Sequence, residues 1–229
     1  MIINVRKVDA WLERIPDQIF TAMLIIQCLL IFIALPCAAA GYPGSRGAVE
    51  SLFIVFAALV IMIARGSAAK TIAILAMVLV TLGAITTLFA PTADLARLSP
   101  IGNIIGGLIV GFVVGRAVLA PGGVTIHRVV GAIVVYLNLG LVFASAYRLI
   151  WSLHPGSMTG IDPQADSLHA AGDVLYFSFV TLTTTGYGDI FPVHPLARSL
   201  ANLESIIGQL YPATLLARLI TLEIQGRHS

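Results

Sequence analysis

The stretch Thr184-Thr185-Gly186-Tyr187-Gly188-Asp189 decides the fold, because its two glycines permit a backbone that other residues resist. Gly186 and Gly188 accept positive φ without a steric cost, so the chain can extend with its carbonyl groups pointing to one side. A ladder of uncharged carbonyl oxygens can replace the hydration shell of a potassium ion. Thr184 adds a hydroxyl oxygen at the inner end of the ladder, and Asp189 closes the outer end. The stretch therefore predicts a path for a dehydrated K⁺ ion.

The composition of the whole chain is that of a membrane protein. Apolar residues make up 58% of the 229 residues and charged residues only 10%, whereas soluble domains are roughly half apolar and a quarter charged. The formal net charge of +2 gives no indication of a nucleic-acid partner. Cys28 and Cys37 fall on opposite faces of one apolar helix, so they cannot share a metal.

Six apolar segments are long enough to be transmembrane helices, which need about 20 residues to cross the hydrocarbon core. They are residues 19–40, 49–64, 71–90, 101–119, 129–151 and 196–222. We interpret the first as a retained span and not a cleaved signal peptide, because it is long and follows an acidic leader. The shorter apolar stretch at residues 174–182 cannot span as a helix and is a candidate re-entrant element.

The placement of lysine and arginine predicts the orientation of these spans. With six spans, nine basic residues lie on one side of the membrane and four on the other. Cytoplasmic loops carry the excess, so we expect a multi-pass protein of the plasma membrane with both termini in the cytoplasm. The nine are Arg6, Lys7, Arg14, Arg65, Lys70, Arg116, Arg128, Arg218 and Arg227; the four are Arg46, Arg97, Arg148 and Arg198.

Breaks in the pattern divide the chain into three parts. Apolar side chains at helical spacing in residues 1–18 predict an amphipathic helix on the inner membrane surface, with a weakly ordered terminus as the alternative. Residues 19–123 predict a four-helix transmembrane domain, whose fourth helix has glycines spaced for close helix packing. Pro121-Gly122-Gly123 separates this domain from the third part, residues 124–229, which contains the carbonyl ladder.

Residues 176–189, YFSFVTLTTTGYGD, resemble the pore helix and selectivity filter of potassium channels, both bacterial and animal. The resemblance covers residues 124–224 in the order outer helix, pore helix, filter and inner helix. It implies an all-α membrane protein with six transmembrane helices, and a re-entrant pore helix and extended filter between helices five and six. Four subunits surround one pore in that family. Because this chain carries one filter, the resemblance implies a homotetramer in the lipid bilayer that conducts K⁺ passively.

The resemblance also assigns roles to individual residues. It implies that Thr184, Thr185, Gly186 and Tyr187 bind K⁺ and that Gly188 completes the filter, with the Tyr187 ring bracing the strand from behind. Asp189 and Phe191 would form the outer mouth. One position departs from the family, which usually has Val or Ile where Thr185 stands. The Thr185 hydroxyl needs a hydrogen-bond partner behind the filter, so we expect preserved selectivity with altered filter stability.

The inner helix contains the candidates for a gate. Gly208 aligns with the hinge glycine of the family, with close packing of a small residue as the alternative. Pro212 is a second weak point, because proline removes one helical hydrogen bond. By alignment, Gln209 and Leu216 would face the cavity or inner gate. Buried Glu204 needs a partner or water: it would either line the cavity or hydrogen-bond Tyr211, Asn202 or the pore helix, which we expect to begin near Ala171 and end at Thr183.

The fourth predicted span lacks a voltage sensor. Residues 101–119 contain one basic residue, Arg116, whereas steep voltage gating needs about 3–4 charges per subunit. We therefore expect weak voltage dependence or none. No nucleophile–base pair or metal cluster in the sequence supports a membrane enzyme. We expect no cofactor besides K⁺ as the permeant ion, and any ligand gate on an unidentified regulatory partner. A poorly selective cation channel and a non-conducting regulatory subunit are the alternatives.

Overall fold

The computed structural model describes residues 18–64, 70–75, 77–78, 81, 93–118, 126–162 and 167–227, and within these ranges leaves out the side chains of residues 93–98, 167–168, 216 and 218–227. The amphipathic segment predicted at residues 1–18 lies outside this description except for its last residue, and the predicted boundary at residues 121–123 lies wholly outside it.

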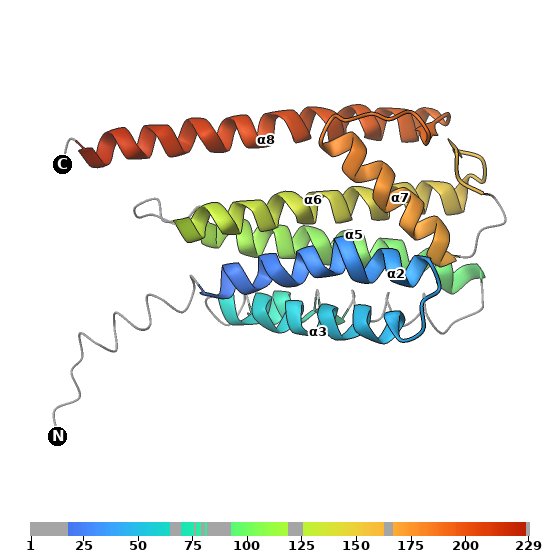
Figure 1. Cartoon of the computed structure of the whole chain (residues 1–229), viewed down its shortest axis with the longest axis horizontal. Helices are drawn as coiled ribbons and strands as arrows, with labels where there is room; N and C mark the ends of the chain where they lie inside the picture. The colour runs from blue at the N-terminus through green and yellow to red at the C-terminus, as the bar shows by residue number, and fades with distance from the viewer. Residues whose placement is uncertain are drawn as a thin grey trace, which may run out of the picture.

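The described chain is mostly helical (Figure 1). The first helix covers Gln18–Ala39 and contains the π-helical turn η1 (Leu30–Ala34) and α2 (Leu35–Ala39). It is followed by α3 (Ser45–Ile63), by helical residues between 70 and 81, and by α5 (Ala93–Val118) and α6 (Ile126–Leu153). The last third consists of β1 (Met158–Thr159), α7 (Ser167–Leu182), β2 (Phe191–Pro192) and α8 (Pro195–Arg227).

Four helices among the described residues are long and apolar enough to cross a membrane: Gln18–Ala39, Ser45–Ile63, Ser99–Val118 and Ile126–Leu153. They match four of the predicted segments to within a few residues at each end. The chain is therefore a helical, multi-pass membrane protein. The predicted span at residues 71–90 lies mostly outside the described residues, and the one at residues 196–222 falls within α8. The count of six spans stays a prediction.

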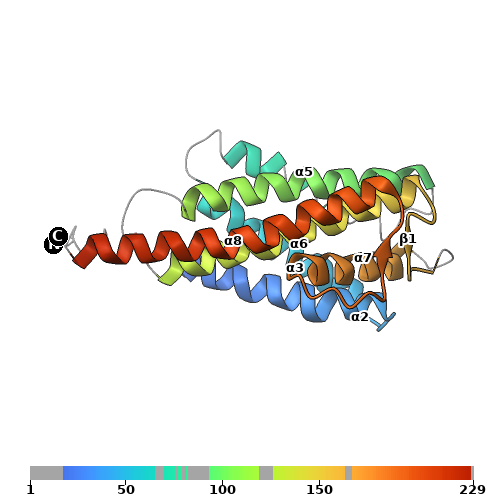
Figure 2. The same ribbon diagram turned by 90° about the horizontal axis from the view of Figure 1, so that it is seen from above.

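The helices form a bundle in which α5 and α6 lie side by side, with α2 and α3 on one side of them and α8 on the other (Figures 1 and 2). The short helix α7 crosses α6 obliquely and also contacts α8 and α2 (Figure 1). The start of the first helix and the C-terminal end of α8 lie at the same end of the bundle, as an even number of crossings would require.

Glycines bring α5 and α6 into close contact. A Cβ atom at Gly107 would lie 2.6 Å from Cγ2 of Val142, and one at Gly111 would lie 3.2 Å from Nδ2 of Asn138. The Asn138 amide also donates to the Gly107 carbonyl at 2.8 Å. Part of the predicted glycine stripe is thus a helix contact, which membrane proteins favour because close backbones gain van der Waals energy.

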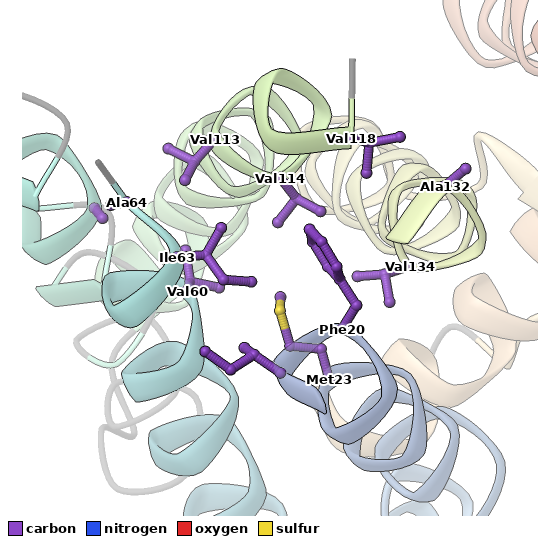
Figure 3. Close-up of a cluster of buried hydrophobic side chains, with 12 residues drawn as sticks. Phe20, Met23, Val60, Ile63, Ala64, Val113, Val114, Val118, Ala132 and Val134 are labelled. Atoms are coloured by element: carbon purple, nitrogen blue, oxygen red, sulfur yellow. The ribbon is translucent and has the colours of Figure 1, made fainter. Parts of the chain in front are cut away.

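A cluster of buried apolar side chains joins the first helix, α3, α5 and α6 (Figure 3). Phe20 and Met23 point from the first helix toward Val114 of α5 and Val134 of α6. Lipid is as apolar as these side chains, so the cluster stabilises the bundle through packing density and not through exclusion of water. It fixes α6, the helix against which α7 packs.

Candidate functional site

The candidate site begins with α7, which runs from one end of the bundle toward its middle (Figure 1). The helix starts at Ser167, four residues before the predicted start near Ala171, and ends at Leu182, one residue before the predicted end. The segment after it returns to the end of the bundle from which α7 started. There β2 pairs with β1 in an antiparallel register that sets Phe191 opposite Thr159.

The backbone of residues 184–188 alternates in the sign of φ. Thr184, Gly186 and Gly188 have φ of 57°, 60° and 81°, and positive φ occurs at neither Thr185 nor Tyr187. Alternation of this kind allows successive carbonyl groups to face the same side, which is the backbone that the glycine spacing predicts. Thr184 is the one non-glycine residue with positive φ in the described chain. Such a conformation costs about 1–3 kcal/mol and accumulates at functional sites.

The last turn of α7 anchors the start of this segment. The carbonyl of Val180 accepts the amides of Thr185 at 2.9 Å and Gly186 at 3.3 Å. The amide of Thr184 donates to the carbonyl of Thr181 at 2.9 Å. Carbonyls at the end of a helix have no partner within the helix, so these bonds satisfy them and hold the strained residue in place.

The hydroxyl of Thr185 has the partner that the sequence required. Its Oγ1 lies 2.9 Å from Oγ1 of Thr183, which in turn donates to the carbonyl of Phe179 at 2.7 Å. A hydroxyl has one proton, so the Thr183 proton is committed to Phe179 and the Thr185 hydroxyl is the donor of the pair. Thr185 is therefore connected to α7 by two successive hydrogen bonds, from Thr185 to Thr183 and from Thr183 to Phe179.

The outer side of the segment is held by two tyrosines and Asp189. The Tyr176 hydroxyl donates to Oδ2 of Asp189 at 2.8 Å, and this hydrogen bond holds the pKa of the Asp189 carboxyl below its ordinary value. The ring of Tyr187 stacks on that of Tyr176, with centroids 6.4 Å apart and planes at 1°. Tyr187 is still 71% exposed in the single chain. Phe191 lies beside this group in β2 and is also exposed.

The inner helix α8 meets the end of α7 at Gly208. A Cβ atom there would lie 1.9 Å from the carbonyl oxygen of Leu182, so only glycine allows this contact. The close-packing alternative for Gly208 thus has direct support, and a hinge at Gly208 stays a prediction. The helix continues through Pro212. Gln209 donates to Oγ1 of Thr184 at 3.3 Å, and the side chain of Leu216 lies outside the described residues.

Glu204 of α8 joins this helix to α6 and α7. The side chain is fully buried. Its Oε2 accepts from the Tyr147 hydroxyl of α6 at 2.6 Å, and its Oε1 lies 2.5 Å from the Ser178 hydroxyl of α7. Of the alternatives for Glu204, the bond to the pore helix is confirmed. Tyr211 is not its partner, because its hydroxyl donates to the Ala132 carbonyl at 2.8 Å.

Sequence reasoning did not single out Tyr147 and Ser178 as partners of Glu204. A signal was present for Tyr147, because a tyrosine within an apolar span must find a partner for its hydroxyl. Ser178 gave no such signal, since a serine in a helix can bond to a carbonyl of its own helix. In the structure it lies 2.8 Å from the Gly140 carbonyl of α6 instead.

Comparison with known proteins finds relatives of part of this chain. Residues 131–224 match the family described as "Ion channel". The inward rectifier potassium channel Kirbac3.1 of Paramagnetospirillum magnetotacticum is 35% identical over 79 residues, which are 33% of this chain and 22% of that protein. The two pore potassium channel c of Oryza sativa subsp. japonica is 38% identical over 73 residues, 32% of this chain and 14% of that protein.

Protein LctB of Bacillus caldotenax is 32% identical over 87 residues, 37% of this chain and 64% of that protein. The matches thus span less than two thirds of the length of each of these relatives. No solved structure matches the chain. The family match covers most of α6, all of α7, residues 184–188 and most of α8, which are the elements that build the candidate site. Residues 131–224 thus resemble ion channels, and two of these relatives are potassium channels.

Proposed function

We propose that the chain is one subunit of a potassium-selective channel whose filter is formed by residues 184–188. The observation that carries this proposal is the alternating sign of φ along these residues, because such a backbone can turn its carbonyls to one side. Carbonyl oxygens of Thr184, Thr185, Gly186 and Tyr187 would bind K⁺, and Gly188 would complete the filter. K⁺ is the permeant ion, and no other cofactor is needed for passive conduction.

A homotetramer follows from this filter, because one strand of carbonyls covers only one side of an ion. Exposure in the single chain supports it. The ring of Tyr187 is left uncovered, and one side of α8 exposes apolar side chains at helical spacing, namely Leu203, Ile206 and Leu210. Neighbouring copies would cover both. Asp189 and Phe191 would then surround the outer mouth.

The proposed topology has six spans and a re-entrant α7. Residues 1–18 would lie on the inner surface, residues 19–123 would form the four-helix domain, and residues 124–229 the pore domain. The return of the chain after α7 to the end where it started supports the re-entrant path (Figure 1). The helix ends deep in the bundle, and the negative end of its dipole favours a cation below the filter. Both termini would be cytoplasmic in the plasma membrane.

Gating belongs to α8 in this proposal. Gly208 and Pro212 are the candidate points of bending, and Gln209 and Leu216 the candidates to face the cavity. The contact of Gln209 with Thr184 supports its place below the filter. Arg116 is the one basic residue of the described side chains in α5, so we propose weak or absent voltage dependence. A regulatory partner remains part of the proposal.

Ion uptake into proteoliposomes tests the proposed function. We expect the purified chain to support K⁺ uptake and Gly186→Asp to abolish it, because the new side chain strains the filter and places a charge beside it. Gly156→Asp is the matched control: Gly156 also has positive φ, at 83°, and open space around it, but it lies in the loop after α6. Uptake that persists in Gly186→Asp would refute the filter. Absence of uptake by a well-assembled wild-type protein would favour a non-conducting regulatory subunit.

A further inference from the structure

A cavity of about 190 Å³ lies between the first four helices and the pore elements α6 and α7, and it is partly open to the surface. An engineered cavity of about 150 Å³ in another protein holds a benzene molecule, so this one has room for a slender apolar group. Its walls are mostly apolar. They include Leu30, Phe53, Val60, Val110, Leu141 and Leu175.

Among the described residues that line the cavity, one is a cation, Arg148 of α6. Among the described residues no acceptor hydrogen-bonds to its guanidinium and no carboxylate pairs with it. Other described arginines do have partners: Arg198 donates to the Pro192 carbonyl at 3.0 Å, and Arg116 lies over the ring of Phe112. Arg148 is half-buried. A guanidinium presents five N–H donors that match phosphate geometry, and here they are unused.

Two polar side chains in the cavity wall, Asn138 and Ser145, do not neutralise the charge of Arg148. The Asn138 amide donates to the Gly107 carbonyl at 2.8 Å, and the Ser145 hydroxyl donates to the Leu141 carbonyl at 2.8 Å. These bonds use the donors of both groups, and neither side-chain oxygen carries the negative charge that would neutralise a guanidinium. The charge of Arg148 therefore requires an anion that this part of the protein does not supply.

The position of Arg148 along α6 indicates where this anion comes from. It lies one turn before Trp151, and α6 ends at Leu153. Tryptophan near the end of a transmembrane helix marks the level of the lipid headgroups. Arg148 is thus at headgroup depth, while the apolar cavity extends from it along the helices.

We propose that this cavity binds one acyl chain of an anionic phospholipid, whose phosphate is held by Arg148. The phosphate would satisfy the guanidinium through charge-assisted hydrogen bonds, and the chain would fill the apolar space between the four-helix part and the pore elements. The bound lipid would then connect the wall formed by α3 and α5 with that formed by α6 and α7.

Lipid retention measured by native mass spectrometry tests the proposal. The full chain is exchanged into micelles with equal amounts of phosphatidylglycerol and phosphatidylcholine, and the lipids that survive detergent removal are counted per chain. We expect retention of phosphatidylglycerol about fivefold above phosphatidylcholine, because one arginine near anionic headgroups contributes about 1 kcal/mol. Arg148→Gln should bring the ratio of phosphatidylglycerol to phosphatidylcholine retained close to one. Arg148→Lys, which keeps the charge, should keep most of the preference for phosphatidylglycerol.

Two further variants separate the headgroup from the chain. Arg46→Gln removes an exposed arginine from α3 and should leave the ratio unchanged. Ala57→Phe fills part of the cavity wall while Arg148 stays in place, and should lower retention of both lipids. An unchanged ratio in Arg148→Gln would overturn the proposal. So would displacement of the lipid by oleate with the same dependence on Arg148, because the ligand would then be a fatty-acid carboxylate. The assay involves no ion flux, so its outcome is independent of the proposed channel function.

Discussion

Glu204 and its two partners make a sharp prediction, because the hydrogen bonds around them can be counted. The Ser178 hydroxyl has one proton and faces two acceptors, the Gly140 carbonyl at 2.8 Å and Oε1 of Glu204 at 2.5 Å. One proton cannot serve both. We predict that a neutral Glu204 carboxyl supplies the second proton, so that Oε1 is the donor to Ser178 while Oε2 accepts from Tyr147. The cluster is then fully satisfied with no buried charge.

These hydrogen bonds determine how much stability each substitution of Glu204 should remove. Glu204→Gln replaces the carboxyl proton by an amide donor of the same shape, so we expect a loss within about 1 kcal/mol. Glu204→Ala leaves the buried Tyr147 hydroxyl without an acceptor, which costs about 1–3 kcal/mol, and opens a void that adds to this. At about 2–4 °C per kcal/mol for a chain of this size, a loss of about 3 kcal/mol lowers Tm by about 6–12 °C.

Thermal unfolding of the purified assembly, followed by loss of its elution peak after heating, measures both variants against wild type. Tyr147→Phe is the third variant. It removes one hydrogen bond to a neutral carboxyl, so a loss of about 1 kcal/mol is expected, whereas an ionised buried carboxylate deprived of its partner would cost about 3–5 kcal/mol. Equal destabilisation by Glu204→Gln and Glu204→Ala would refute the neutral carboxyl. A Glu204→Ala protein as stable as wild type would refute its structural role.

Three further predictions concern the filter and its supports. Thr185→Val removes the hydrogen bond to Thr183, which is worth about 1 kcal/mol. Single-channel records should therefore show the closing rate of the filter changed about fivefold while the K⁺ selectivity stays the same. Unchanged gating kinetics would dismiss the role of this hydroxyl. Gly208→Ala places a methyl group where α7 and α8 touch and should abolish K⁺ uptake or assembly, and normal uptake would contradict that contact. Tyr176→Phe removes the bond that lowers the pKa of Asp189. The wild-type carboxylate stays charged as pH falls until the lowered pKa is reached, so acid applied outside should reduce flux at a higher pH in the variant; identical pH profiles would contradict the coupling.

The backbone geometry of residues 184–188 was predictable because it is local. Two glycines spaced by one residue set the alternation of φ, and Gly186 and Gly188 carry it in the structure. The partner of Thr185, which the sequence did not name, lies two residues away in the turn that ends α7. Four of the predicted spans were equally accessible, since length and hydropathy alone define them.

Contacts between distant parts of the chain were not predictable in this way. Tyr147 and Glu204 are separated by 57 residues, and nothing in either local pattern names the other. The sequence placed Arg148 on the outer side by charge counting, but the lack of a counter-ion appears only when α3, α5 and α7 surround it. The true start of α7 at Ser167 was missed because His169 and Gly172 interrupt the apolar pattern that marked the later turns.

The central claim is that residues 184–188 select K⁺, and the reversal potential of the reconstituted channel tests it most directly. With a tenfold K⁺ gradient across the bilayer and Na⁺ balancing the total cation concentration, a K⁺-selective filter sets the reversal potential close to the K⁺ equilibrium value, about 59 mV for a singly charged ion. We predict this value for wild type and for Thr185→Val. A reversal potential near zero would show that the pore passes both cations and would contradict the account.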